Sequence, residues 1–268
     1  MKIEVSNLTV GYDGGPPVLN GVDLGIKSGK VVTLIGPNGS GKSTMLKVIA
    51  RTLRPYSGTV YIDDKNVHSF NTRKLARMMS VLPQSNSAPE DITVEELVEY
   101  GRFPYRRLLQ GFSPADVESV DRALQLTGLE TMRKRAVSAL SGGERQRAWI
   151  ALNLAQKPKV MLLDEPTTYL DVCHQFDIID LIRRMNLQLG ITIVMVLHDL
   201  NLAARYSDEI VVMKDGAIFS QGRPGDVIKE EMLREVFNIK AHLTMDEKEV
   251  PHFVPVGSCS RAVLSEDF

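Results

Sequence analysis

The sequence lacks the features that would place it in a membrane or in an oxidising compartment. No stretch approaches the roughly 20 consecutive apolar residues of a membrane-spanning helix, and the first residues, MKIEVSNLTV, lack the apolar core of a secretory signal. The only cysteines are Cys173 and Cys259, too few for a disulfide scaffold or a four-cysteine zinc site. We therefore expect a chain that neither crosses a membrane nor is exported, with two unreactive cysteines in a reducing cytosol.

An excess of either charge is also absent. Lysine and arginine number 32, aspartate and glutamate number 33, and the formal net charge is −1. This balance gives no general signal for a polyanion, so we do not expect nucleic acid as a partner. Hydrophobic residues make up 43% and charged residues 24%, which is typical of a folded protein. The length of 268 residues allows one large or two modest domains, and no internal repeat or low-complexity segment is present.

The first part of the chain predicts a β-rich layer that leads into an α/β unit. Alternating and fully apolar runs predict short strands within residues 1–35, and helical spacing follows a glycine-rich loop. The expected elements are strands in residues 2–10, Val22–Ile26 and Val31–Ile35, a helix over Lys42–Leu53, and strands over Thr59–Ile62 and Met79–Leu82.

Three N-terminal capping patterns predict helices in the middle of the chain. They begin at Thr93, at Ser113 and at Ser141, each with an acidic residue three positions later. Residues 85–140 are therefore expected to be mainly helical, and the third pattern opens a helix to about Gln156.

The remainder predicts a return to the α/β core. Expected elements are a buried strand at Val160–Leu163, a helix capped by Asp171 and stopped near Gly190, a strand at Ile191–Leu197, a hairpin of Ile210–Met213 with Ala217–Ser220, a helix over Val227–Phe237, and a weakly patterned tail to Phe268.

A glycine-rich loop between a strand and a helix carries the first chemical signal. It satisfies the pattern G-x-x-x-x-G-K-[ST] in the required context, and the glycines let successive backbone N–H groups surround phosphates. In this pattern Lys42 reaches the β and γ oxygens, and Ser43 ligates Mg²⁺. The predicted phosphate-binding residues are Gly36, Pro37, Asn38, Gly39, Ser40, Gly41, Lys42 and Ser43.

Two adjacent carboxylates end the buried strand at Val160–Leu163. Asp164 can hold Mg²⁺ through its water, and Glu165 faces elsewhere because side chains alternate along a strand. Glu165 is therefore the candidate for polarising an attacking water. Alone, these two motifs fit many nucleotide hydrolases and kinases.

The motif Leu140-Ser141-Gly142-Gly143-Glu144 distinguishes among them, because it resembles the LSGGQ-like signature of the ATP-binding subunits of ABC transporters. The resemblance spans about residues 1–240 and implies a fold of the α/β class: a P-loop NTPase core of the ABC ATPase type, with an antiparallel β region and a helical subdomain at about 85–156. Residues 241–268 would then be a C-terminal tail.

The resemblance also implies roles for individual residues. Tyr12 stands where the family stacks an aromatic ring on adenine, and Thr44 follows Ser43 in the nucleotide site. Gln84 matches the Q-loop residue that contacts Mg²⁺ and the attacking water, and His198 matches the switch histidine near the γ-phosphate.

The signature implies a second copy of the chain. In the family, the residues matching Ser141, Gly142 and Gly143 close on the γ-phosphate held by another subunit, so two ATP molecules join a head-to-tail homodimer. Asp171 matches the D-loop aspartate that connects the subunits. Tyr169 departs from the pattern, because many members have a small residue there, and this leaves the local interface geometry open.

Two further stretches resemble the ATPases of iron-siderophore, haem and vitamin B12 importers: Tyr100–Arg107 and Thr167–Gln175. This resemblance implies a peripheral subunit at the cytoplasmic face of the membrane. Its expected partners are transmembrane permease subunits, which read residues 85–112, and indirectly an extracytoplasmic solute-binding protein.

Alternatives remain at this stage. The chain could serve another type of ABC transporter, act as a soluble ABC ATPase of translation or DNA repair, or be a phosphate-loop kinase, although the signature and His198 disfavour a kinase. The cationic and aromatic residues of 85–112 could be an ordinary solvated face. His242 and His252 are expected to be solvated tail histidines.

Overall fold

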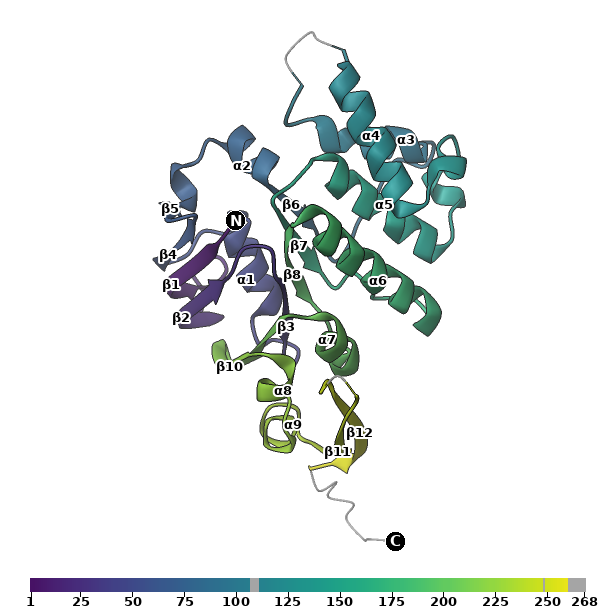
Figure 1. Cartoon of the computed structure of the whole chain (residues 1–268). Helices are drawn as coiled ribbons and strands as arrows, with labels where there is room; N and C mark the ends of the chain where they lie inside the picture. The colour runs from purple at the N-terminus through teal and green to yellow at the C-terminus, as the bar shows by residue number, and fades with distance from the viewer. Residues whose placement is uncertain (107–110, 248, 260–268) are drawn as a thin grey trace, which may run out of the picture.

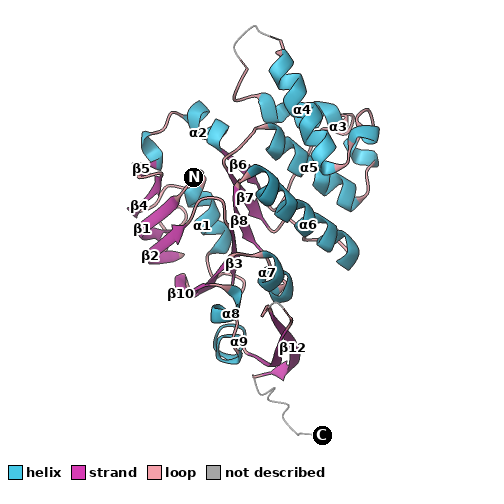
Figure 2. Cartoon of the chain, in the orientation of Figure 1, coloured by secondary structure: helices cyan, strands magenta, loops and turns pink. Residues whose placement is uncertain are grey.

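The computed structural model describes residues 1–106, 111–247 and 249–259. Its elements form an antiparallel sheet, a mainly parallel central sheet, a helical region beside one end of that sheet, and a C-terminal hairpin (Figure 1). Figure 2 separates these layers by secondary structure and shows the helical region, α3 to α5, apart from the strands. The sequence-based fold class is confirmed.

The central sheet positions the site. In the described part of the chain it has six strands in the order β10-β9-β3-β8-β7-β6, and all neighbours are parallel except β9 and β10. Every residue of β3, β7 and β8 is buried, which explains why they read as continuous apolar runs. The carboxyl ends of the parallel strands therefore share one edge. The strands are β3 Val31–Ile35, β6 Met79–Leu82, β7 Val160–Asp164, β8 Thr192–Val196, β9 Glu209–Lys214 and β10 Ala217–Gly222.

The antiparallel sheet and the first helix form a second packed layer. The sheet has the order β2-β1-β4-β5, and its apolar side chains share a core with α1 and with Val32 and Leu34 of β3. α1 ends earlier than expected, at Ile49, because Arg51 takes a left-handed backbone conformation (φ 60°). The elements are β1 Ile3–Val10, β2 Leu19–Ile26, α1 Lys42–Ile49, β4 Ser57–Ile62, β5 Lys65–Asn66 and α2 Thr72–Met78, of which β5 and α2 were not predicted.

Helices α3 Val94–Glu99, α4 Pro114–Thr127 and α5 Gly142–Ala155 make the helical region. All three capping boxes are formed, so the predicted starts of these helices are confirmed. A buried ion pair joins two of the segments: Arg102 Nε lies 2.8 Å from Asp116 Oδ1, and Arg102 Nη1 donates to the carbonyl of Ala155 (2.6 Å).

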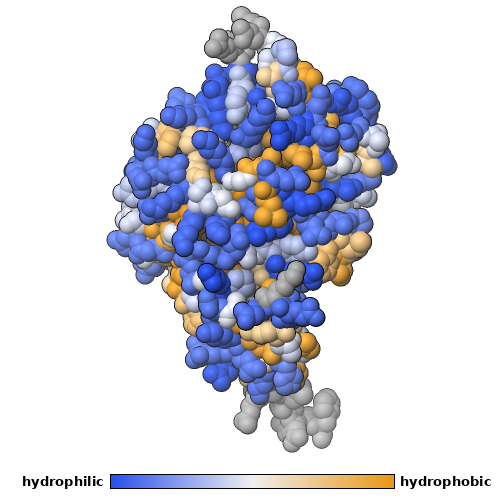
Figure 3. Space-filling model, in the orientation of Figure 1, coloured by the Kyte–Doolittle hydropathy of each residue, from blue (hydrophilic) through white to orange (hydrophobic). Residues whose placement is uncertain are grey.

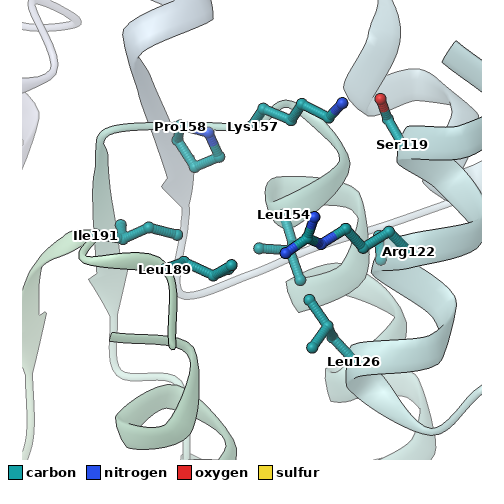
Figure 4. Close-up of a pocket in the computed structure, with 9 residues that line it drawn as sticks. Ser119, Arg122, Leu126, Leu154, Lys157, Pro158, Leu189 and Ile191 are labelled. Carbon is teal, nitrogen blue, oxygen red and sulfur yellow. The ribbon is translucent and has the colours of Figure 1, made fainter. Parts of the chain in front are cut away.

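The helical region and the central sheet do not pack completely against each other. A cavity of about 240 Å³ lies between α4, α5 and the end of α6 Val172–Leu189. Leu126, Leu154 and Leu189 line it, with Arg122 and Lys157 beside them (Figure 4). Figure 3 shows a mainly hydrophilic face with hydrophobic residues gathered in patches, one of them near the middle of the view. None of the residues that line the cavity belongs to the predicted nucleotide site.

The C-terminal part differs from the prediction in two ways. The single helix expected over Val227–Phe237 is two helices, because Ile228 and Lys229 are extended between them. The expected weakly patterned tail contains a hairpin that packs beside α7 and α9; residues 248 and 260–268 of that tail lie outside the described residues. Asn201 fixes β12 by accepting from the Phe253 amide (3.1 Å) and donating to its carbonyl (3.3 Å). The elements are α7 Leu200–Tyr206, α8 Pro224–Val227, α9 Glu230–Phe237, β11 Ile239–Met245 and β12 Pro251–Ser258.

The tail histidines were expected to be solvated. His242 is exposed on β11, as expected, and His252 on β12 is partly exposed, with 3.7 Å between its Nε2 and Asp246 Oδ2. No helix within the described residues is long and apolar enough to span a membrane.

Candidate nucleotide-binding and hydrolytic site

The loop between β3 and α1 has the backbone that a phosphate cradle requires. Gly36, Gly39 and Gly41 all have positive φ (151°, 80° and 100°). A Cβ on Gly36 would lie 2.1 Å from the Met213 carbonyl oxygen, so only glycine fits there. The Ser40 hydroxyl is buried and, within the described residues, has no hydrogen-bond partner. An oxygen-rich anion would satisfy this orphaned group, which fits the predicted phosphate site.

Lys42 extends across the inside of this loop. Its Nζ donates to the carbonyls of Gly36 and Pro37, at 2.8 Å each. Burial lowers the pKa of the Lys42 ammonium, and the charges of Glu165 and Asp164 oppose that effect in part. A buried cation held only by neutral carbonyls is poorly compensated, and phosphate oxygens would compensate it better.

Ser43 and Asp164 meet where α1 begins and β7 ends. Ser43 Oγ donates to Asp164 Oδ1 (2.9 Å). Burial raises the pKa of Asp164; the Ser43 hydrogen bond opposes this and the nearby Glu165 charge adds to it. A hydroxyl and a carboxylate are the hard oxygen donors that Mg²⁺ prefers beside a nucleotide. The described residues contain no cluster of three His, Cys, Asp or Glu side chains suited to a metal, and a phosphate-bound Mg²⁺ does not require one.

Glu165 is held by three side chains. His198 Nε2 lies 2.7 Å from Oε1, while Gln84 Nε2 (2.8 Å) and Thr168 Oγ1 (2.9 Å) donate to Oε2. Burial pushes the pKa of Glu165 upward, but hydrogen bonds from His198, Thr168 and Gln84 outweigh it and hold the pKa below its ordinary value. Gln84, Glu165 and His198 follow β6, β7 and β8, so neighbouring strand ends bring the predicted catalytic trio together.

Tyr12 lies in the loop that follows β1 and contacts the first turns of α1. Its hydroxyl is 3.1 Å from Thr44 Oγ1, and Lys47 Nζ lies 5.3 Å from the ring centroid. The ring is 42% exposed. An exposed aromatic ring at the edge of the phosphate loop is placed where it could stack on a base.

The signature residues form a separate group with the D-loop. Ser141 and Glu144 cap α5 reciprocally, and Ser141 and Gly142 are exposed at its N-terminus. Asp171 caps α6 and contacts His174. Within the described residues, no hydrogen bond or ion pair joins Ser141, Gly142, Gly143 or Asp171 to the phosphate loop.

Sequence reasoning missed Thr168 and His174. Thr168 reaches Glu165 because Glu165 itself has a left-handed backbone (φ 54°), which turns the chain back on itself. The signal available in the sequence was a hydroxyl-bearing residue three positions after the Glu165 carboxylate.

Two exposed residues lie close to these positions. Tyr169, which departs from the family pattern, also has positive φ and is 94% exposed, and Cys173 is exposed on the first turn of α6.

Comparisons with known proteins identify the family of the chain. A model of the ABC transporter family matches residues 19–168. The chain is 45% identical to the achromobactin transport ATP-binding protein of Dickeya dadantii (strain 3937), over 93% of both proteins. It is 42% identical to the iron(3+)-hydroxamate import ATP-binding protein of Bacillus subtilis (strain 168), over 92% of this chain and 91% of that protein.

Solved structures resemble it as well. A nucleotide-free ATP-binding cassette from an ABC transporter has a TM-score of 0.75 at 26% identity, covering 93% of this chain and 98% of that one. A dimeric, post-hydrolysis ATP-binding cassette bound to ADP and phosphate has a TM-score of 0.70 at 31% identity, covering 82% and 98%.

Proposed function

The chain belongs to the ABC transporter family as an ATP-binding, ATP-hydrolysing subunit, and we propose that the transport it powers is uptake of an iron-siderophore complex, haem or a related metal chelate. The cargo class is supported by relatives named for transport of achromobactin and import of iron(3+)-hydroxamate. The observation that carries the hydrolytic assignment is the set of hydrogen bonds on Glu165 beside the Ser43–Asp164 pair.

Each group has a defined task in the proposed reaction. The phosphate loop and Lys42 bind the phosphates, and Tyr12 stacks on adenine. Ser43, Asp164 and Gln84 would hold Mg²⁺, which neutralises phosphate charge when bound. Glu165 accepts a proton from the attacking water. Its lowered pKa keeps it ionised at neutral pH, and Oε1, with one partner against two on Oε2, has more remaining acceptor capacity.

The active form is proposed to be a head-to-tail homodimer. Ser141, Gly142 and Gly143 stand at the N-terminus of α5, a position that favours anions, and Ser141 and Gly142 are exposed there. In the dimer they complete the ATP site of the second copy, with Asp171 at the shared D-loop interface. The proposed ATPase unit, residues 1–240 with a helical subdomain at about 85–156, contains both the phosphate loop and the signature. Residues 241–268 follow it as a C-terminal extension.

Permease subunits are proposed to dock near the Q-loop. Tyr100 and Phe103 stack with ring centroids 4.9 Å apart, and both are exposed. The Arg106 guanidinium lies 5.7 Å from the Phe103 ring. Aromatic and arginine side chains are enriched in interfaces. Residues 107–110 of the expected docking segment, including Arg107, lie outside the described residues. This docking would place the chain peripherally, at the cytoplasmic face of the membrane.

The decisive experiment is capture of the assembled transporter. A tagged Glu165→Gln chain is isolated from native membranes with Mg-ATP, and co-purifying proteins are identified. Recovery of a polytopic permease with a solute-binding protein, whose bound chelate can be analysed, is the expected result. A Lys42→Ala chain serves as a control that should not be trapped in the nucleotide-bound state. Recovery of soluble partners alone would instead favour a non-transport ABC ATPase.

A further inference from the structure

We propose that His174 is a positioning residue that fixes the signature turn to the D-loop of the same subunit, so that both reach the second copy as one unit. The inference rests on the proposed head-to-tail dimer and adds a residue to which that function assigns no role.

The first observation is a close approach between His174 and Gly143. A Cβ placed on Gly143 would lie 2.3 Å from His174 Cδ2, 3.0 Å from Cγ and 3.2 Å from Nε2. The imidazole therefore lies directly against the signature backbone, at a buried position where any side chain would displace the ring. The His174 ring therefore requires glycine at the second glycine position of the signature.

The second observation is the orientation of that ring. His174 Nδ1 lies 2.8 Å from Asp171 Oδ1, and the His174 backbone N–H donates to the same oxygen (2.9 Å). One carboxylate oxygen of Asp171 thus both caps α6 and orients the His174 imidazole. The D-loop aspartate consequently reaches the signature through His174.

A further contact joins α5 to the chain just before the D-loop, because Gln146 Nε2 donates to the Pro166 carbonyl (2.7 Å). Within the D-loop side of the junction, Gln175 Nε2 donates to the Leu170 carbonyl (2.9 Å) and fixes Leu170. A Cβ on Gly142 would lie 3.4 Å from Leu170 Cδ2. Both signature glycines therefore rest on residues of the D-loop or of the turn that follows it.

Fixing these two segments together has a consequence for ATP hydrolysis. In the proposed dimer, Gly142, Gly143 and Asp171 must meet the partner's nucleotide and interface at the same time. A rigid link removes the need to order the two segments separately on closure. Loss of the link should weaken ATP-driven dimerisation and turnover without weakening ATP binding to the monomer, because Lys42, Ser43 and Tyr12 lie elsewhere.

The test uses the full chain with His174→Ala and His174→Asn. Asparagine keeps a donor toward Asp171 but lacks the ring that contacts Gly143. Asp177→Asn, an exposed substitution one turn along α6, is the matched control. The expected result is a fall of about tenfold or more in kcat for both His174 variants, unchanged ATP affinity of the monomer, and no change for Asp177→Asn.

Dimerisation is measured separately in the Glu165→Gln background by analytical ultracentrifugation with Mg-ATP. Addition of His174→Ala should raise the dimer dissociation constant at least about tenfold, with an unchanged melting temperature as the check on folding. Equal dimerisation and equal kcat in the His174 variants would overturn the positioning role. If Glu165→Gln alone does not dimerise with Mg-ATP, the proposed dimer itself is wrong, and the two failures are thereby distinguished.

Discussion

Glu165 combines two demands that usually conflict, since it is largely buried but must stay ionised. Its hydrogen bonds to His198, Gln84 and Thr168 resolve the conflict. Replacement by glutamine keeps the shape and removes the base, so kcat should fall by about 10² to 10⁴-fold while ATP affinity is retained. Phosphate release and nucleotide titration measure the two quantities. Wild-type turnover in this variant would contradict the assignment of Glu165 as base.

Thr168 offers a test of how the carboxylate is tuned. A base with a lowered pKa works above that pKa, and activity is lost as pH falls through it, so the acidic limb of kcat/KM should lie below 4.5. Thr168→Val removes one hydrogen bond to the ionised form while burial continues to raise the pKa. The acidic limb should therefore move to higher pH, with neutral-pH turnover little changed. An unmoved limb, in protein shown by circular dichroism to stay folded, would remove Thr168 from the tuning.

For single residues, the sequence predicts which side chains lie in the site better than it predicts which side chains contact them. Strand ends and motif order are sufficient to place Gln84, Asp164, Glu165 and His198 at one edge of the sheet. The Thr168 and His174 contacts depend on left-handed backbone at Glu165 and on a glycine–imidazole approach. Neither has a periodic signature in the sequence.

Among the elements, the helical region depends on the buried pair of Arg102 and Asp116, whose side chains are 4% and 9% exposed. Asp116→Ala leaves Arg102 uncompensated and removes half of the α4 capping box, so the free energy of unfolding should fall by about 3 to 5 kcal/mol. Urea denaturation at neutral pH measures it, with exposed Glu118→Gln as the control. A loss within the error of the control would show that the pair is not stabilising.

The same pair gives an acid dependence with a definite sign. Burial raises the pKa of Asp116, but hydrogen bonds from Ser113 and Arg102 and the Arg102 charge outweigh it, so the pKa lies below 3.8. The stabilisation is present above the unfolded pKa and is lost as pH falls through the lowered folded value. The difference in stability between wild type and Asp116→Ala should accordingly shrink below about pH 4.

Elements with strong local or apolar signals were mostly predicted correctly, whereas the C-terminal hairpin and the break between α8 and α9 were not. The β9–β10 turn at Asp215 and Gly216 has the two positive φ values that an Asp-Gly hairpin requires. By contrast, β11 and β12 contain few buried residues, and they depend on contacts with α7 and α9. At the break between α8 and α9, Ile228 is extended and its side chain is buried, a tertiary contact that helical spacing does not reveal.

For the whole molecule, Asn201 connects the C-terminal hairpin to the central sheet, because α7 begins two residues after His198, which itself follows β8. Asn201→Ala should increase amide hydrogen exchange in β12 by about tenfold while ATP turnover stays unchanged, since each lost hydrogen bond contributes about 1 kcal/mol. Hydrogen-exchange mass spectrometry measures this, with Asn20→Ala as a distant exposed control. Unaltered exchange would mean that apolar packing alone holds the hairpin.

The geometry of the complete ATP site could not be predicted from one chain, because the proposed site uses residues of two copies. The phosphate loop and the Glu165 centre are built within a single copy, whereas the signature has no hydrogen bond to that loop within the described residues. Its proposed place opposite ATP rests on the family resemblance and on two-fold symmetry, not on folding of the monomer.

The exposed thiol of Cys173 lies one residue before His174, on the surface that the proposed dimer would cover. The chain therefore carries a native chemical reporter of its own closure. With Cys259→Ser removing the other thiol, a maleimide fluorophore should label Cys173 readily in the open form and slowly once Mg-ATP has joined two Glu165→Gln copies. The rate of alkylation then reports closure of the ATP-bound dimer in real time, and no new cysteine has to be introduced.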